Sequence, residues 1–341
     1  MIGFGRSEPS PALSGCQIVL SGVQPTGEIH IGNYFGAIKN FVQLQEKYRC
    51  IYFIADYHAI TVEHEPTLLS QRTLDLAKDF LACGIDPERS ILFVQSHIPE
   101  HTELAWILSC VTSYGDLSRM TQFKEKGERQ GFVSAGLFNY PVLQAADILI
   151  YKAQKVPVGR DQVQHIELTR RIARRFNSRF GEFFPEPEPL LTEAASIKST
   201  NDPAKEMSKS LGPKHYIGLM EPEEVIREKI KKAVTDVGPR ALGAQPQQKS
   251  PGVANLFLLL KLTAPPNIYD AFEAEYAKGT LKYEKLKEAV FEHLMQELQP
   301  IRERRKQLKE SQVRDILQEG AAKAREIAQQ TLKEARKRIG V

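Results

Sequence analysis

Residues 21–36 combine glycines with side chains that can donate hydrogen bonds. These residues are Gly22, Gly27, Gly32, His30 and Asn33, between a short apolar run and a segment with helical spacing. The unpaired N–H groups at a helix start attract phosphate, and glycine lets a ligand approach the backbone closely. The segment therefore predicts a strand, a turn and a phosphate-binding helix start, although glycine spacing alone would equally suit a plain turn.

A second candidate is Lys209, which stands between Ser208 and Ser210. Pro203 and Pro213 flank this segment, so we expect a loop rather than regular structure. A lysine between serines is by itself an ordinary surface feature. Together with a phosphate-binding helix start it favours a clamp, because an ammonium group offsets negative charge on phosphate oxygens.

A third candidate is a carboxylate in a largely apolar helix, which we expect to begin with Asn139 as its cap and Pro141 in its first turn. Its polar residues at helical spacing are Tyr140, Gln144, Asp147 and Tyr151. Because the positions between them are apolar, Asp147 should be buried and needs a partner. Asp147 either pairs with an arginine or caps a neighbouring element, or it accepts a hydrogen bond from a ligand ring while Gln144 and Tyr140 hold the ligand's ammonium or carboxylate.

Short apolar runs alternate with helical patterns over the first two-thirds of the chain, and this alternation predicts an α/β fold with a doubly wound parallel sheet. The predicted strands are residues 16–20, 50–60, 91–94 and 156–158. Ligands should lie at their carboxyl ends. Asp56, Tyr57 and His58 end the second run, where such polar clusters are usually only hydrogen-bonded turns.

Beyond residue 213 the pattern is helical throughout. The predicted helices are residues 221–234, 252–262, 266–277, 282–308 and 313–339, the fourth interrupted by Pro300 and the last carrying an apolar stripe from Leu317 to Ile339. We therefore expect a flexible extension over residues 1–15, an α/β catalytic domain over 16–212 and an all-helical domain over 213–341. The last helix could pack back on the catalytic domain.

Composition indicates a soluble protein with a slight positive charge. Apolar residues make up 42% of the 341 residues, the formal net charge is +4, and no run reaches membrane-spanning length. Four widely spaced cysteines indicate reduced core thiols and a cytoplasmic location. Basic residues cluster over residues 170–179 and 302–306, which suits either a solvated helix face or contact with nucleic acid.

Two tetrapeptides carry a family resemblance. Residues 30–33 read His-Ile-Gly-Asn and residues 207–210 read Met-Ser-Lys-Ser, which resembles the two signature motifs of class I aminoacyl-tRNA synthetases. The sequence of residues 22–27 and 32–34 looks specifically like that of the tryptophan enzymes of bacteria. The resemblance covers almost the whole chain from Gln17 onward.

The resemblance implies a Rossmann-like catalytic domain and a set of site residues. It assigns His30, Lys209 and Gln24 to catalysis. It assigns ATP contacts to Gln24, Pro25, Thr26, Gly32, Asn33, Gly159, Arg160, Asp161, Gln162, Ile197, Glu206, Met207, Ser208, Lys209 and Ser210. It assigns tryptophan contacts to Asp147, Tyr140, Gln144 and Gln162, with Asp147 accepting the indole N–H. Arg160 and Glu206 depart from the family's usual Glu and Lys.

The same resemblance implies substrates and partners. They are L-tryptophan, ATP bringing Mg²⁺, and tRNA(Trp), with no permanent cofactor or protein-held metal, and a homodimer. Tyrosine–tRNA ligases share the pattern of Tyr140, Gln144 and Asp147, so this helix alone leaves the amino acid open. A small-molecule nucleotidyltransferase and a catalytically silent paralogue are further alternatives.

Overall fold

The computed structural model describes residues 16–121, 133–159, 162–191, 196–235 and 249–341. The chain divides into two compact units. The first comprises Met1–Gly27, Phe41–Thr192 and Lys309–Val341, and the second comprises Glu28–Asn40 and Glu193–Leu308.

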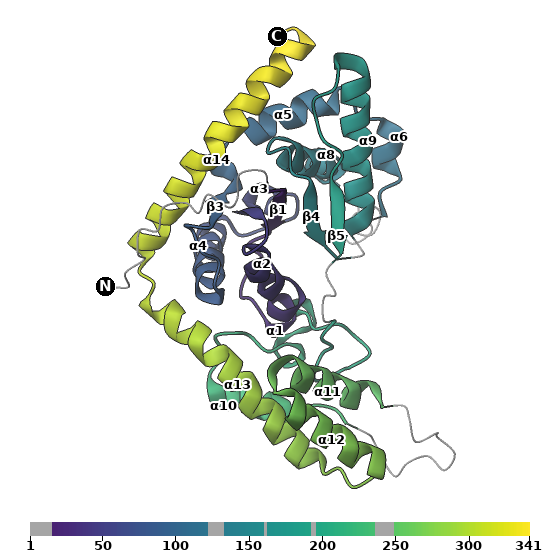
Figure 1. The fold of residues 1–341 in the computed structure, drawn as a ribbon, viewed down its shortest axis with the longest axis vertical. Coiled ribbons are helices and arrows are strands. Elements are labelled where there is room, and N and C mark those ends of the chain that lie inside the picture. Colours follow the sequence, from purple (N-terminus) through teal and green to yellow (C-terminus); the bar gives the residue numbers. More distant parts are fainter. Residues whose placement is uncertain (1–15, 122–132, 160–161, 192–195, 236–248) are drawn as a thin grey trace. The chain divides into compact units, whose positions relative to one another are not determined.

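The described part of the first unit is built on a parallel sheet with the strand order β3-β2-β1-β4-β5 (Figure 1). Its strands are β1 (Ile18–Val23), β2 (Arg49–Ile54), β3 (Ser90–Val94), β4 (Lys155–Val158) and β5 (Glu188–Leu191). All neighbouring pairs are parallel, so the predicted α/β fold is confirmed. The chain runs outward from β1 to β3 and later from β4 to β5, so the order switches direction between β1 and β4, where such sheets bind ligands.

Helices surround this sheet. They are α2 (Lys39–Leu44), α3 (Asp56–Ala59), α4 (Pro66–Cys83), α5 (Glu100–Ser109), α6 (Tyr114–Ser118), α8 (Ala135–Leu149), α9 (Val163–Phe180) and α14 (Glu310–Ile339), with a 3₁₀ turn η3 (Gln95–His97). Helix α8 packs against α5 and α9. The core between these elements includes Phe53, Phe93 and Phe176.

Helix α14 lies directly against the main chain of β3. A Cβ atom at Gly320 would come within 1.9 Å of the Leu92 carbonyl oxygen, so only glycine permits this approach. Leu317, Ala324 and Ala328 are buried on the same helix, which confirms most of the predicted apolar stripe. The last helix of the chain thus belongs to the unit that holds the sheet.

The second unit contains helical elements. They are α1 (Ile31–Asn33), a π-helical turn η2 (Tyr34–Ile38), the 3₁₀ turns η5 (Lys209–Leu211) and η6 (Pro213–His215), and α10 (Glu223–Lys231), α11 (Pro251–Thr263), α12 (Pro266–Lys278) and α13 (Tyr283–Gln307). Glu297 of α13 accepts hydrogen bonds from Tyr34 at 2.6 Å and Lys39 at 2.7 Å. In the described part of the chain, no helix is long and apolar enough to cross a membrane.

Three local predictions were wrong. Helix α8 begins at Ala135, because the Ser134 side chain accepts from the Leu137 N–H at 3.0 Å and caps the helix before Asn139. Pro300 does not interrupt α13, which is anchored by buried Leu298 and Ile301 on either side of it. The second predicted strand ends at Ile54 rather than at residue 60, because Asp56–Ala59 form the short helix α3. The sequence analysis did not predict Glu188–Leu191, which pairs with β4 as an edge strand, a position where proline is tolerated.

The cysteines were only partly predicted. Cys50 and Cys83 are buried, whereas Cys16 is half-buried and Cys110 is exposed, and all four are free thiols. Two of them are therefore core residues, and the other two are not.

Candidate functional site

The helix start in the second unit is built around His30. His30 caps α1: its Nδ1 accepts from the Asn33 N–H at 3.3 Å, and the Asn33 Oδ1 accepts from the His30 N–H at 3.2 Å. A Cβ atom at Gly32 would lie 2.9 Å from His30 Nδ1 and 3.5 Å from Met207 Cβ. The predicted helix start is confirmed, and glycine is needed in it because the imidazole and the loop of Met207 crowd that position.

The imidazole of His30 is neutral at physiological pH. Burial, and secondarily the charge of Lys209, lowers the pKa of His30 to about 4. Because Nδ1 accepts the Asn33 N–H, we assign the hydrogen of the neutral ring to Nε2. His30 can therefore donate a hydrogen bond to an acceptor such as a phosphate oxygen.

The lysine loop lies beside this helix start. The Met207 N–H donates to the Ile197 carbonyl at 3.0 Å, and both side chains are buried. Lys209 Nζ donates to the Glu28 carbonyl at 2.8 Å. The second unit thus brings together the two tetrapeptides and Ile197, although they lie far apart in the sequence.

Three polar residues of the loop contact one another or a neighbouring side chain. The Ser208 and Ser210 hydroxyls are 2.9 Å apart. Glu206 accepts from the Ser196 hydroxyl at 2.7 Å and approaches Lys198 Nζ at 3.4 Å, and the Ser196 hydrogen bond is the main reason that its pKa is lowered. Lys198, which sequence reasoning missed, is thus the cation beside the unusual Glu206.

In the first unit, Asp147 lies in a buried hydrogen-bond network. Its Oδ1 accepts from Gln95 Nε2 at 2.8 Å and lies 2.6 Å from His101 Nδ1, and its Oδ2 lies 2.7 Å from His58 Nε2. Asp147 has no exposed surface. Burial alone would raise the pKa of Asp147, but the hydrogen bonds from His101 and His58 outweigh burial and bring it to about 2. The carboxylate is therefore ionised.

The rest of the predicted polar face lies around this network. The Tyr140 hydroxyl is 2.9 Å from His165 Nε2, and the Tyr140 ring lies edge-on to His58 with 6.3 Å between centroids. Gln144 is half-buried. Of the alternatives for Asp147, pairing with an arginine or capping a neighbouring element is wrong, because two histidines and an amide surround the carboxylate.

The residues after β1 and β4 occupy the carboxyl edge of neighbouring strands. Gln24, Pro25 and Thr26 follow β1, and the Thr26 N–H closes a tight turn onto the Gln24 carbonyl at 2.8 Å. Gly159 follows β4, and the Gln162 N–H donates to its carbonyl at 3.0 Å. Arg160 and Asp161 lie outside the described residues.

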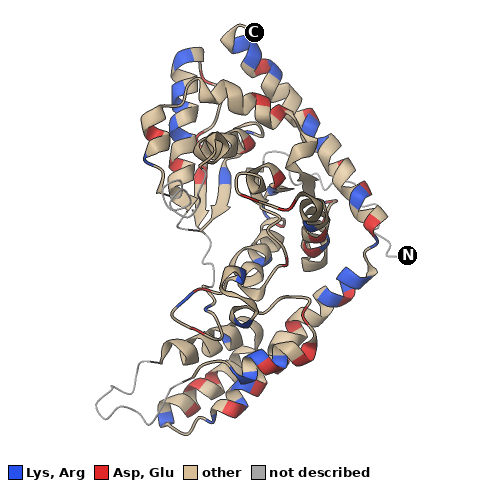
Figure 2. Cartoon of the chain, turned by 180° about the vertical axis from the view of Figure 1, so that it is seen from behind, with Lys and Arg blue, Asp and Glu red and all other residues tan. Residues whose placement is uncertain are grey.

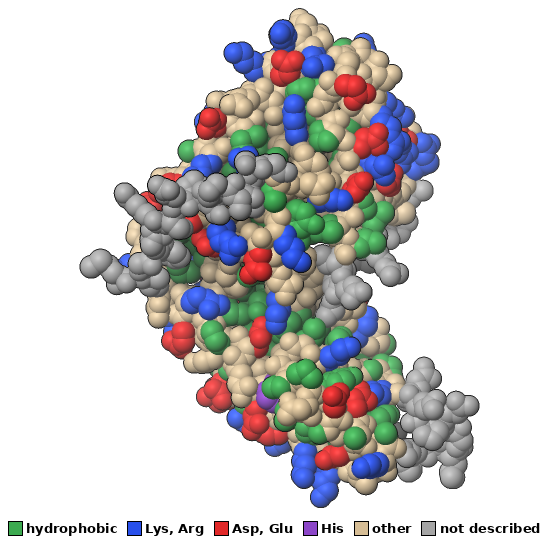
Figure 3. All heavy atoms as spheres, in the orientation of Figure 1, with side chains coloured by type: hydrophobic (Ala, Val, Ile, Leu, Met, Phe, Trp, Pro, Cys, Tyr) green, Lys and Arg blue, Asp and Glu red, His purple; other side chains and the backbone are tan. Residues whose placement is uncertain are grey.

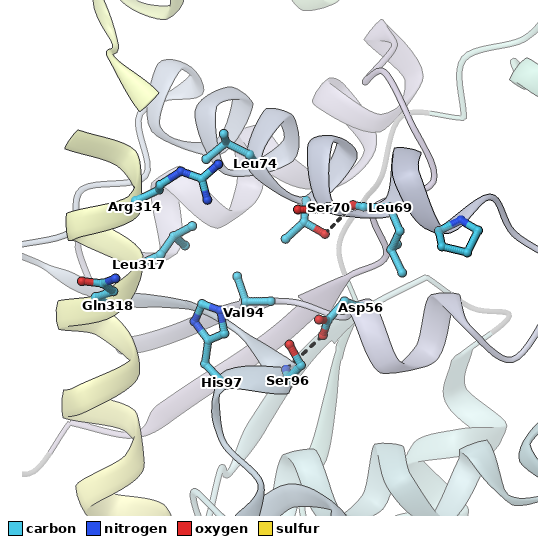
Figure 4. Close-up of a pocket in the computed structure, with 12 residues that line it drawn as sticks. Asp56, Leu69, Ser70, Leu74, Val94, Ser96, His97, Arg314, Leu317 and Gln318 are labelled. Carbon is cyan, nitrogen blue, oxygen red and sulfur yellow. Dashed lines mark hydrogen bonds between the residues drawn. The ribbon is translucent and has the colours of Figure 1, made fainter. Parts of the chain in front are cut away.

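A cavity of about 410 Å³ lies in the first unit, and none of the predicted catalytic, ATP-binding or tryptophan-binding residues lines it (Figure 4). Its walls include Asp56, Ser96, His97, Leu317 and Arg314, from α3, η3 and α14. The Asp56 Oδ1 accepts from the backbone N–H groups of Tyr57 at 3.1 Å and Ser96 at 3.0 Å. Asp56 is thus hydrogen-bonded turn structure, whereas His58 two residues later contacts Asp147.

The arginines of α9 form a basic helix with several ion pairs (Figures 2 and 3). Arg171 Nη1 and Arg175 Nη1 lie 3.0 and 2.7 Å from the buried Asp116 carboxylate, which Arg119 also contacts. Burial would raise the pKa of Asp116, but these arginines, Arg175 foremost, lower it. The arginines are still partly exposed and retain an excess of positive charge over this carboxylate.

Comparisons with known proteins show which family the chain belongs to. The family described as "tRNA synthetases class I (W and Y)" matches residues 15–299. The tryptophan–tRNA ligase of Clostridium acetobutylicum is 46% identical, with 95% of this chain and 97% of that protein covered. The tryptophan–tRNA ligase of Caldanaerobacter subterraneus is 44% identical over 95% and 98% of the two chains. The crystal structure of tryptophanyl-tRNA synthetase from Campylobacter jejuni, complexed with ADP and tryptophan, is 38% identical, covers 95% of this chain and all of that one, and has a TM-score of 0.83.

The chain therefore belongs to the class I tRNA synthetases, the family of the tryptophan and tyrosine enzymes. Its predicted enzyme class, an aminoacyl-tRNA ligase, is confirmed. The relatives reported above carry the tryptophan name, so the predicted resemblance to the tryptophan enzymes of bacteria is confirmed as well.

Proposed function

We propose that this chain is a ligase that activates L-tryptophan with ATP and transfers it to tRNA(Trp). The observation that carries this proposal is the cluster of His30, Gly32 and Lys209 in the second unit. It combines a neutral imidazole donor, a helix start and an ammonium group. The tryptophan–tRNA ligase name of relatives that cover nearly the whole chain supports the choice of amino acid.

ATP binds with its phosphates at His30, Gly32 and Asn33 and with its adenine near Ile197. Gln24, Pro25, Thr26 and the turn from Gly159 to Gln162, with Arg160 and Asp161, complete the nucleotide contacts, together with Glu206, Met207, Ser208 and Ser210. The described residues contain no group of three His, Cys, Asp or Glu side chains that could hold a metal ion, so we expect Mg²⁺ to arrive on the triphosphate. When bound, the ion neutralises charge on the phosphate oxygens.

The chemistry is phosphoryl-centred displacement. The carboxylate of tryptophan attacks the α-phosphorus, the bond to the β-phosphate oxygen breaks, and pyrophosphate leaves with that electron pair. Lys209 offsets the charge that builds on the phosphate oxygens, and His30 donates to one of them. The 2′-hydroxyl of the terminal tRNA ribose then attacks the mixed anhydride and displaces AMP.

Tryptophan binds with its indole N–H donating to Asp147. A carboxylate offers about four lone-pair positions. Among the described residues Oδ1 has two donors and Oδ2 has one, so a position on Oδ2 suits one further donor. Tyr140, Gln144 and Gln162 hold the ammonium and carboxylate groups of the amino acid.

Partners and location follow from the same proposal. The helices beyond residue 213, apart from α14, which packs on β3, recognise the tRNA anticodon region, and the basic face of α9 attracts tRNA phosphates. Two large side chains are exposed, Trp106 of α5 at 72% and Tyr114 at the start of α6 at 77%, which supports a homodimer that covers them. The four free thiols suit the reducing cytoplasm.

Amino-acid-dependent ATP–pyrophosphate exchange tests the proposal, with tryptophan and tyrosine compared and tRNA absent. We expect exchange with tryptophan alone. Exchange with tyrosine alone would assign Asp147 to a phenol and replace the named amino acid, while the mechanism would stand. Absence of exchange with both, in a folded protein that binds ATP, would favour a catalytically silent paralogue.

A further inference from the structure

The buried network of Asp147 continues through His101 to Tyr151. His101 Nδ1 lies 2.6 Å from Asp147 Oδ1, and His101 Nε2 lies 2.7 Å from the Tyr151 hydroxyl. Asp147 and His101 have no exposed surface, and Tyr151 is 1% exposed. Asp147 lies in α8 and Tyr151 just beyond its end, whereas His101 comes from α5. Two packed helices thus hold one chain of hydrogen bonds.

The direction of these hydrogen bonds is fixed by the groups at the two ends. An ionised carboxylate only accepts, so Nδ1 of His101 donates to Asp147. The Tyr151 hydroxyl has no other hydrogen-bond partner among the described residues, so its hydrogen is satisfied by donating to Nε2. Tyr151 therefore holds His101 in the tautomer that serves Asp147.

The same contacts decide which carboxylate oxygen can accept a further hydrogen bond. Oδ1 accepts hydrogen bonds from His101 and Gln95, whereas Oδ2 accepts only from His58 among the described residues. Gln95 is itself fully buried and approaches the same oxygen at 2.8 Å. The carboxylate cannot rotate without breaking two of its three hydrogen bonds, so Oδ2 keeps its direction.

We propose that His101 is a positioning residue that sets the specificity of the site for a ligand ring carrying an N–H donor. It does so by holding Oδ1 of Asp147, so that Oδ2, which has one donor among the described residues, keeps a second acceptor position in a fixed direction. This inference rests on the proposed function, in which Asp147 accepts the indole N–H. Without the His101 donor the carboxylate can turn toward the vacated space or take up a proton, and in both cases the indole N–H loses its acceptor.

Two variants of similar size separate hydrogen bonding from packing. In His101→Asn the amide nitrogen stands near the place of Nδ1 and donates to Asp147, whereas His101→Leu has no donor. Both leave the same space where the rest of the imidazole was. Each variant is compared with wild type using two substrates, L-tryptophan and its analogue in which sulfur replaces the indole N–H. The readouts are kcat and KM for each amino acid and KM for ATP in pyrophosphate exchange.

We expect wild type to prefer tryptophan over the sulfur analogue by about tenfold or more, the usual effect of one hydrogen bond to a charged group. His101→Leu should lose most of this preference, chiefly through KM for tryptophan. His101→Asn should retain most of it, and KM for ATP should be unchanged in both. Equal losses for both amino acids in the two variants would indicate packing alone and overturn the proposal.

The outcomes distinguish this inference from the proposed function. A wild-type preference that survives in folded His101→Leu overturns only the role of His101. If wild type shows no preference, Asp147 does not read the N–H group, and its proposed role is overturned together with that of His101. Should His101→Leu not fold, His101→Gln decides. Its amide stands near the place of Nε2, where it can reach the Tyr151 hydroxyl but not Asp147, so the preference should fall, and an unchanged preference overturns the proposal.

Discussion

Replacing Lys209 with methionine tests whether this ammonium group stabilises charge during adenylate formation. Methionine keeps an unbranched apolar stem and removes the charge. In the free protein Lys209 Nζ donates to the Glu28 carbonyl at 2.8 Å, and Glu28 lies two residues before His30. The ammonium group is therefore already beside the helix start to which we assign the phosphates.

The expected effect follows from the distance at which such groups act. Two unit charges about 4 Å apart interact by roughly 4 kcal/mol at an effective dielectric constant of about 20. Part of this attraction already acts on bound ATP, and part replaces the contact with Glu28. We therefore expect adenylate formation to slow by about 100- to 1000-fold, which corresponds to about 2.7–4 kcal/mol. Tryptophan affinity should change by no more than about twofold, because the contact strengthens only in the transition state.

Replacing Lys209 also changes the pKa of His30, but only to a limited extent. Lys209 is one of two causes that lower the pKa of His30, and burial is the larger. Removal of the lysine charge should raise that pKa only partway toward its ordinary value. His30 then stays mostly neutral at and above neutral pH, so the rate at that pH reports the lysine.

Rapid-quench measurement of tryptophanyl-adenylate formation in a single turnover gives the rate, and equilibrium dialysis of labelled tryptophan gives the affinity. Lys214→Met, at an exposed lysine of the neighbouring turn η6, is the matched control and should behave as wild type. An activation rate within about threefold of wild type in folded Lys209→Met would refute the role of this ammonium group.

Three further predictions concern separate parts of the molecule. Asp147→Asn should weaken tryptophan binding by about 1–3 kcal/mol and leave ATP binding intact; unchanged dialysis with tryptophan would exclude Asp147 from the site. Gly320→Ala should destabilise the fold by roughly 1–3 kcal/mol in urea unfolding, because the methyl group meets the Leu92 carbonyl; a gain in stability, as alanine usually gives in a helix, would contradict that packing. The folded pKa of His30 is about 4, below its ordinary 6.5, so its contribution to stability is full above pH 6.5 and is lost as pH falls through 4. His30→Asn should flatten the curve of unfolding free energy against pH in that interval, and an identical slope in both proteins would be the contrary result.

The fold was largely predictable because its strands are buried apolar runs and its helices follow a clear period. The alternation of these patterns gives the parallel sheet, and Gly320 could not be distinguished from any other helical glycine until β3 lay against it. Element boundaries were less predictable. Ser134 and Asn139 are both good caps, and only the chain's path decides that Ser134 is used.

The second unit's cluster was the most predictable part of the site. The tetrapeptides at 30–33 and 207–210 each contain a residue whose chemistry suits phosphate, and the structure brings them together through Gly32 and Met207. What the sequence could not supply is Lys198, whose pairing with Glu206 depends on an isolated antiparallel bridge between those residues. Such a contact leaves no periodic signal.

The partners of Asp147 were missed for a different reason. A buried carboxylate requires donors, but the requirement does not say which side chains supply them. His58 and His101 lie 89 and 46 positions away in the sequence. Nothing in the local sequence distinguishes either histidine. His58 lies just beyond the end of a strand, and His101 lies in the first turn of a helix.

The identity of those partners has a chemical consequence. An arginine, one of the alternatives that the sequence left open, would donate from its planar guanidinium group to both carboxylate oxygens. Two imidazoles and an amide instead each bring one donor from a separate element, and two of the three converge on Oδ1. The arrangement satisfies the buried charge and still leaves Oδ2 able to accept one more hydrogen. Under the proposed function, a carboxylate held in this way distinguishes a ring that carries an N–H group from one that does not, which is the property that a site selective for indole needs.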